Sequence, residues 1–178
     1  MASQSPDFRK LIRSVPDFPK PGVVFRDITT VIADAQALRA AVKQMAEPFR
    51  KDRIDLVVGI ESRGFIFGAA LAIELGVGFV PVRKPGKLPY QTASETYQLE
   101  YGTDTIEIHT DAVKAGQRVL MVDDLLATGG TMAAACRLVE RLGGTVAGIS
   151  FLIDLAFLGG RQKLGDRKIV ALVSYDAE

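Results

Sequence analysis

Val-Leu-Met-Val-Asp-Asp-Leu-Leu-Ala-Thr-Gly-Gly-Thr, at positions 119 to 131, decides how the rest of the chain is interpreted. Its four leading apolar residues predict a strand buried on both faces, and Asp123 and Asp124 follow where that strand is expected to end. A Thr/Gly turn comes next, before an Ala-rich helix that we expect to begin at Met132. Glycines let a backbone approach an anion closely, and the amides and dipole at a helix start attract it. The turn therefore predicts a phosphate-binding loop.

The acid pair constrains the rest of the ligand. No G-x-G-x-x-G follows the strand and no Gly-Lys-Ser/Thr occurs in the chain, so the turn matches neither the dinucleotide fingerprint nor the Walker P-loop. Because carboxylates repel phosphate, Asp123 and Asp124 must face another part of the same ligand. Vicinal sugar hydroxyls fit, and the two acids would also stabilise positive charge that develops on the sugar. The implied ligand is a ribose 5-phosphate; the alternative is a buried strand that ends in a solvated Asp-Asp turn.

Composition points to a globular protein. The chain has 178 residues, enough for one domain, and 48% of them are hydrophobic. Its 22 Lys and Arg residues nearly balance 21 Asp and Glu residues, so the net charge of +1 gives no reason to expect nucleic-acid or membrane binding. The single cysteine, Cys136, is expected to be a buried structural thiol. The first residues contain no apolar run typical of a signal peptide, which favours a cytoplasmic enzyme.

Apolar runs alternate with helical patterns along most of the chain. Strands are expected at 54–59, 79–82, 119–122, 145–153 and 169–173, a polar hairpin at 96–101 and 105–108, and helices at 6–14, 34–49, 64–75, 132–142 and near 157–164. Such alternation predicts an α/β fold with a mostly parallel sheet covered on both faces. Ligands of these sheets bind beyond the carboxyl ends of the strands.

The run at 119–131 resembles the phosphoribosyl pyrophosphate (PRPP) binding motif of type I phosphoribosyltransferases, and its ending resembles the adenine-specific members. The resemblance extends from Phe18 to about Leu164. It implies the type I phosphoribosyltransferase fold, a mostly parallel twisted sheet flanked by helices, in one domain over residues 1–178. A small N-terminal hood (about 1–33), a core (about 34–178) and a flexible loop are implied with it. The resemblance assigns the 5-phosphate of PRPP to Ala127, Thr128, Gly129, Gly130 and Thr131, and the ribose hydroxyls to Asp123 and Asp124.

Two further segments are expected to bind the pyrophosphate of PRPP. Ser62 and Arg63 directly follow the expected strand at 54–59, so they belong to the same sheet edge as the acid pair; an exposed turn is the alternative. Arg83, Lys84 and Lys87 stand among prolines and a glycine, and by resemblance form the loop that closes over PRPP, excludes water and neutralises pyrophosphate. Alone, such a charge run would more often be a solvated surface.

The base site is predicted from resemblance as well. Glu100 and Tyr101 match the Glu-Tyr pair of the family, in which the carboxylate would accept the proton lost from adenine N9; an exposed strand glutamate is the alternative. In the hood, Phe25 would stack on the base while backbone groups near Val24 and Arg26 recognise its amino edge, and Leu155 would contact the other face. Without the resemblance, the hood segment would be interpreted as a core strand.

The predicted reaction converts adenine and PRPP to AMP and pyrophosphate through an oxocarbenium-like transition state. Asp123, Asp124 and Glu100 are the predicted catalytic residues, and Mg²⁺ is expected to bind through PRPP and water rather than directly to protein. His109 is the only histidine, which leaves little basis for histidine catalysis. By resemblance a homodimer is expected. The alternatives are transfer to a 6-oxo purine or orotate, and a non-catalytic PRPP-binding regulator.

Overall fold

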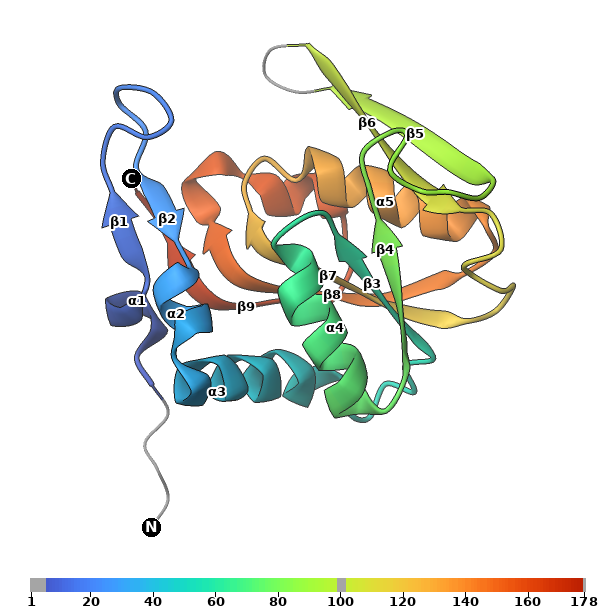
Figure 1. Cartoon of the computed structure of the whole chain (residues 1–178), viewed down its shortest axis with the longest axis horizontal. Coiled ribbons are helices and arrows are strands. Elements are labelled where there is room, and N and C mark those ends of the chain that lie inside the picture. Colours follow the sequence, from blue (N-terminus) through green and yellow to red (C-terminus); the bar gives the residue numbers. More distant parts are fainter. Residues whose placement is uncertain (1–5, 99–101, 178) are drawn as a thin grey trace.

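The computed structural model describes residues 6–98 and 102–177. A five-stranded parallel sheet in the order β4-β3-β7-β8-β9 forms its centre (Figure 1). The strands are β3 (Leu56–Ile60), β4 (Gly78–Val82), β7 (Arg118–Leu126), β8 (Thr145–Leu155) and β9 (Ile169–Tyr175). The predicted α/β class and parallel sheet are confirmed.

Helices and a hairpin cover the two faces of this sheet. On one face α3 (Ala35–Ala46) and α4 (Gly64–Leu75) pack with the N-terminal elements around Phe49, Phe67 and Leu71. On the other, α5 (Gly130–Arg141) and the antiparallel hairpin of β5 (Thr92–Gln98) and β6 (Thr103–His109) enclose a second core. The remaining short helices are α1 (Phe8–Leu11), α2 (Thr29–Ala33), η1 (Glu47–Phe49), η2 (Ala156–Leu158) and η3 (Gly160–Leu164).

The strand order reverses between β3 and β7. From β3 the chain passes through α4 to β4 on one side, and after the hairpin it returns to β7 on the other side, from which β8 and β9 continue outward. Loops that leave adjacent parallel strands in opposite directions open a crevice at their carboxyl ends, where ligands of α/β sheets bind. The fold therefore brings the segments that follow β3 and β7 together.

Strand β7 is longer than predicted. It continues through Asp123 and Asp124 to Leu126, paired with β8 throughout. Its pairing with β3 ends at Val122, opposite Gly59. The acids therefore come where one edge of β7 loses its neighbour, rather than where the strand ends, and this free edge opens toward the crevice.

Other bounds also differ from the sequence-based expectation. The predicted helix at 6–14 is limited to α1, because Arg13–Val15 form strand β1, which pairs with β2 (Phe25–Asp27). The hairpin begins at Thr92 rather than at 96. Helix α4 has the predicted bounds, and Asp34 caps α3 by accepting hydrogen bonds from the amides of Gln36 and Ala37.

The β1–β2 hairpin lies at the left of Figure 1 and the β5–β6 hairpin at the upper right, with α4 and the central strands between them. The side chain of Arg26 in β2, 8% exposed, ties the first hairpin to the sheet. Its guanidinium lies 4.0 Å from the ring centroid of Tyr175 in β9 and donates a hydrogen bond to Ser14. Within the described part of the chain, no helix combines the length and apolar character needed to cross a bilayer.

Candidate active site

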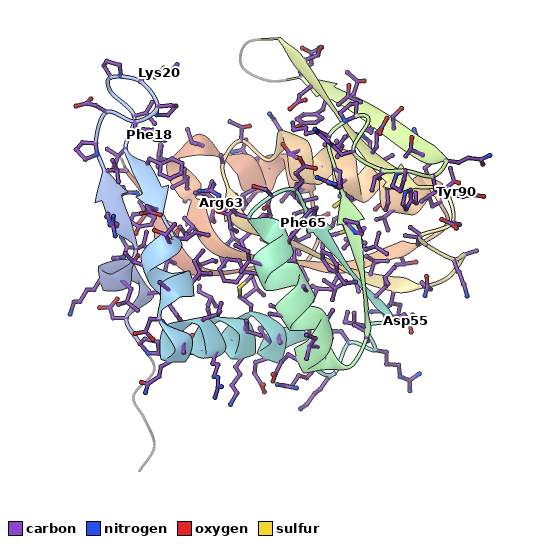
Figure 2. All side chains as sticks on the ribbon, viewed as in Figure 1. Phe18, Lys20, Asp55, Arg63, Phe65 and Tyr90 are labelled. Atoms are coloured by element: carbon purple, nitrogen blue, oxygen red, sulfur yellow. The ribbon has the colours of Figure 1, made fainter. Side chains whose placement is uncertain are left out.

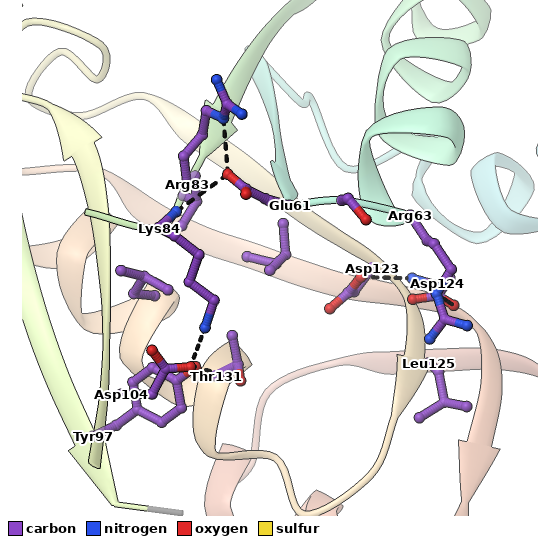
Figure 3. Close-up of a pocket in the computed structure, with 14 residues that line it drawn as sticks. Glu61, Arg63, Arg83, Lys84, Tyr97, Asp104, Asp123, Asp124, Leu125 and Thr131 are labelled. Carbon is purple, nitrogen blue, oxygen red and sulfur yellow. Dashed lines mark hydrogen bonds and ion pairs between the residues drawn. The ribbon is translucent and has the colours of Figure 1, made fainter. Parts of the chain in front are cut away.

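A cavity of about 350 Å³ occupies the crevice (Figure 3). Its walls come from the ends of β3, β4 and β7, the start of α5 and the β5–β6 hairpin. The described polar and charged residues that line it are Glu61, Ser62, Arg63, Arg83, Lys84, Tyr97, Asp104, Asp123, Asp124 and Thr131. Four of the five predicted pyrophosphate ligands therefore share one cavity with the acid pair. The fifth, Lys87, is exposed and does not line it; its carbonyl accepts from Arg83 Nη1 at 3.1 Å and its amide donates to the carbonyl of Lys84 at 3.3 Å.

A smaller cavity of about 90 Å³ adjoins the first. Residues 125–132 line it, together with Asp123 and Phe151. Helix α5 begins at Gly130, two residues earlier than predicted, so the first-turn amides of a twelve-residue helix face this small cavity. All five predicted 5-phosphate residues, 127 to 131, line it.

Two glycines set the shape of this phosphate loop. Gly129 has φ +77°, and a Cβ there would lie 2.4 Å from the carbonyl oxygen of Gly160 in η3. A Cβ on Gly160 would in turn lie 2.1 Å from the carbonyl oxygen of Ala127. Such approaches exclude any side chain, so the backbone after β7 and the backbone after β8 hold each other in place.

The acid pair is partly shielded from solvent, since Asp124 is buried and Asp123 is half-buried. Loss of hydration raises the pKa of Asp123 well above its usual range, and the negative charge of Asp124 adds to that shift. Burial also raises the pKa of Asp124, against the opposing effect of Arg63, whose Nε is 2.8 Å from Asp124 Oδ2. Gly64 lets α4 pass close to Asp123, because a Cβ at that position would be 2.7 Å from Asp123 Oδ1.

The cations from β4 and its following loop also have carboxylate partners. Arg83 Nε donates to Glu61 Oε2 at 2.8 Å, and the same oxygen accepts the amide of Lys84 at 3.2 Å. Lys84 Nζ forms an ion pair with Asp104 in β6. The hydrogen bond from Lys84 is the largest cause that lowers the pKa of Asp104 below its usual value. The loop thus touches both walls of the cavity through charged contacts.

The predicted base-binding residues stand apart from both cavities. Val24, Phe25, Arg26 and Leu155 are absent from the described residues that line them. Phe25 nevertheless reaches the site indirectly, since the guanidinium of Arg63 lies 5.1 Å from its ring centroid. Figure 2 shows Arg63 between the start of α4 and the hood hairpin. The predicted Glu100 and Tyr101 fall outside the described residues.

Three residues that line the larger cavity were missed by the sequence analysis. Glu61 directly precedes Ser62, so its position after a buried strand was a usable signal. Tyr97 and Asp104 are directly opposite each other in the β5–β6 register, and no motif in the sequence marks them. Thr131 Oγ1 donates to Tyr97 Oη at 3.0 Å, and Tyr97 Oη donates to Asp104 Oδ2 at 3.1 Å. The hairpin is thereby linked to the phosphate loop.

Direct metal ligands are sparse. Across residues 6–98 and 102–177, no three His, Cys, Asp or Glu side chains come together as a group that could hold a metal ion. Cys136 is buried in α5, and burial raises the pKa of its thiol to about 12, as expected of a structural cysteine. His109 is the last residue of β6 and is half-buried, with Tyr90 beside it.

Comparison with known proteins agrees with this geometry. Residues 29–171 match the model of the phosphoribosyl transferase domain. The chain belongs to the phosphoribosyltransferase family. It is 57% identical over 169 residues to an adenine phosphoribosyltransferase of Desulfitobacterium hafniense, with 95% of this chain and 98% of that protein covered. With the adenine phosphoribosyltransferase of Acaryochloris marina the identity is 60%, over 95% and 99% of the two chains.

Solved structures of family members have the same fold. The adenine phosphoribosyltransferase of Thermoanaerobacter pseudethanolicus superposes with a TM-score of 0.92 at 55% identity, covering 94% of this chain and 97% of that chain. The Saccharomyces cerevisiae enzyme, solved with an imino-altritol bisphosphate and adenine, gives 0.89 at 41% identity over 97% and 99% of the two chains. The type I phosphoribosyltransferase fold expected from the sequence is confirmed.

Proposed function

We propose that this chain transfers the 5-phosphoribosyl group of PRPP to adenine, which yields AMP and pyrophosphate. One observation carries the proposal: Asp123 lines both cavities and lies between the phosphate loop and the cations Arg63, Arg83 and Lys84. PRPP carries a 5-phosphate, a ribose and a pyrophosphate in the same order as the phosphate loop, Asp123 and the cations follow one another in the site.

The same arrangement suits the chemistry. As pyrophosphate departs, negative charge builds up on the leaving group and positive charge on the ribose ring. The cations of the larger cavity face the first, and the carboxylates of Asp123 and Asp124 face the second. Ribose hydroxyls would donate to these carboxylates and orient the anomeric carbon toward the base.

Adenine as the acceptor is supported by the names of the relatives and by the hood. Because the guanidinium of Arg26 is engaged by Tyr175 and Ser14, the backbone beside Val24 and Arg26 is what this segment can offer to a base. Backbone amides and carbonyls distinguish an amino edge from an oxo edge, since the wrong base would leave buried groups unpaired. Phe25 and Leu155 would contact the two faces of the ring, and Glu100 would accept the N9 proton.

Mg²⁺ fits the charge balance of the larger cavity. Among the described residues that line it, four carboxylates outnumber three cations; the carboxylates are Glu61, Asp104, Asp123 and Asp124. The protein alone therefore offers little net positive charge to a highly charged pyrophosphate. Bound Mg²⁺ would supply that charge through the oxygens of PRPP and water. No direct protein ligand is proposed.

We further propose a cytoplasmic homodimer. The outer face of α4 presents Ile66 and Ile73, two turns apart, and Ile73 is 83% exposed, which a partner subunit would cover. The single cysteine is a buried thiol, as suits a reducing compartment. Sedimentation analysis of the purified protein tests the dimer, and a monomer at micromolar concentration would contradict it.

The reaction is tested by measuring pyrophosphate and AMP together. With PRPP, adenine and Mg²⁺, we expect one AMP for each pyrophosphate, no release without a base, and loss of turnover when Mg²⁺ is chelated. Asp124→Asn should slow turnover, whereas near-normal activity would remove Asp124 from its ribose role. PRPP binding with no pyrophosphate release for any base would instead indicate a regulator.

A further inference from the structure

Each cation that lines the larger cavity, within the described part of the chain, has a carboxylate of the same cavity as its partner. The pairs are Arg63 with Asp124, Arg83 with Glu61, and Lys84 with Asp104. An anionic ligand must therefore share or displace these contacts before the cations can serve it.

Asp104 is held in place without help from Lys84. Its Oδ1 accepts the amide of Thr105 at 2.8 Å, and its Oδ2 accepts the hydroxyl of Tyr97 at 3.1 Å. Tyr97 is buried and is itself tied to Thr131 of the phosphate loop. If Lys84 moved to another anion, the Asp104 carboxylate would keep two hydrogen bonds and its position.

Lys84, in contrast, can exchange partners. Its side chain extends from the end of β4 across the cavity to Asp104 (Figure 3). The two side chains are 41% and 29% exposed, and ion pairs at such exposure are weak enough to be broken by a competing anion. A long, rotatable ammonium donates equally well to a phosphate oxygen.

We propose that Asp104 competes with pyrophosphate for Lys84 and so weakens the hold of the enzyme on this product. Asp104 is then a positioning residue that acts through Lys84 and speeds product release. This inference rests on the proposed function, which makes pyrophosphate a ligand of the larger cavity. Lys84 would turn toward the pyrophosphate of bound PRPP and return to Asp104 when the product leaves.

Titration calorimetry with inorganic pyrophosphate and Mg²⁺ tests this exchange directly. Asp104→Asn removes the competing charge but retains the size of the side chain, and we expect pyrophosphate to bind about fivefold more tightly. Product inhibition should strengthen by the same factor while the KM for adenine stays within about twofold. Asp104→Glu should restore the parent affinity. Asp111→Asn, an exposed residue outside the cavity, is the matched control and should change nothing.

A double-mutant cycle separates the exchange from simple repulsion. In a Lys84→Met background, the gain from Asp104→Asn should shrink, and an equal gain in both backgrounds would overturn the proposal. Unchanged or weaker pyrophosphate binding by Asp104→Asn would also overturn it, because Asp104 would then hold Lys84 ready for the ligand.

A second variant serves if Asp104→Asn fails to fold. Asp104→Ser also removes the carboxylate that pairs with Lys84, and it should tighten pyrophosphate binding as Asp104→Asn does; unchanged or weaker binding would contradict the exchange. Because pyrophosphate binding is measured without adenine, a parent enzyme that binds pyrophosphate but forms no AMP would refute the proposed function and leave this test intact.

Discussion

The two halves of the site are built by different means. The phosphate half, residues 61–64 and 123–131, comprises the end of β7, the loops that follow β3 and β7, and the first residues of α4 and α5. Close contacts at Gly129 and Gly64 fix its shape. The base half, residues 24–27 with Leu155, belongs to a two-stranded hairpin and the end of β8. Side-chain contacts join this hairpin to the rest of the fold, with Arg26 stacked on Tyr175 and Phe25 beside Arg63.

Each half should be sensitive to a different kind of substitution. Backbone contacts leave no room for a Cβ, so the phosphate half should respond to the smallest side chain added at its glycines. The stacking of Arg26 on Tyr175 should survive replacement of the tyrosine by another aromatic residue and weaken when the ring is removed. Substitutions in one half should therefore change the kinetics of one substrate and spare the other.

The largest effect is expected at Glu100, which is proposed to serve the base although it lies outside the described residues. Replacing Glu100 by Ala removes the proposed acceptor of the adenine proton, and kcat should fall about a hundredfold or more while the KM for PRPP changes little. Steady-state kinetics with each substrate varied measure both values. An unchanged kcat would remove Glu100 from the mechanism.

In the phosphate half, a side chain at Gly129 should disrupt PRPP binding. In Gly129→Ala the new Cβ meets the carbonyl oxygen of Gly160 and the backbone is strained at φ +77°, so the loop must move. We expect the KM for PRPP to rise about thirtyfold or more, a misplacement effect. Gly116→Ala is the matched control, since Gly116 has φ +84° and open space around it; strain alone should leave the KM near the parent value.

A smaller effect is expected where the hood is anchored. Tyr175→Leu removes the ring beneath Arg26, so the hairpin loosens and the KM for adenine should rise about tenfold with the KM for PRPP within about twofold. Tyr175→Phe keeps the ring and loses only a hydroxyl that has no hydrogen-bond partner, so it should behave like the parent. Equal changes in both KM values would show that the halves are not independent.

The smallest effect is on stability and depends on pH. The pKa of Asp123 is raised in the folded chain, so between the ordinary value near 3.8 and the raised one the folded chain binds more protons than the unfolded chain. The free energy of unfolding should therefore lose this contribution as pH rises through that window. At pH 7, Asp123→Asn should raise the Tm of the free protein by a few degrees. A lower Tm would contradict the cause assigned to the shift, and exposed Asp111→Asn should leave Tm unchanged.

The same contrast explains what could be predicted from the sequence. The apolar run at 119–122 and the Thr/Gly turn indicated a buried strand and a phosphate loop, because local composition determines both. The continuation of β7 through the acids could not be seen, since it depends on where β3 stops pairing. Tyr97 and Asp104 were missed because only the hairpin register places them in the cavity.

The residues of the base half were predicted through resemblance, but the contacts that attach the β1–β2 hairpin to the sheet were not. Arg26 was expected to act through its backbone, yet nothing near it in the sequence points to Tyr175 almost 150 residues later. Contacts between distant segments need the fold itself. Composition also did not separate Lys87 from Arg83 and Lys84 of the same loop, although only the last two line the cavity.

We propose that this fold joins adenine to PRPP in strong preference to the 6-oxo purines. AMP, IMP and GMP formation from PRPP with adenine, hypoxanthine and guanine, compared side by side at equal enzyme and Mg²⁺ concentrations, measures it most directly. We predict a kcat/KM for adenine at least about a hundredfold above that for either 6-oxo purine, since each would leave buried backbone groups unpaired. Comparable rates with hypoxanthine or guanine would contradict the account.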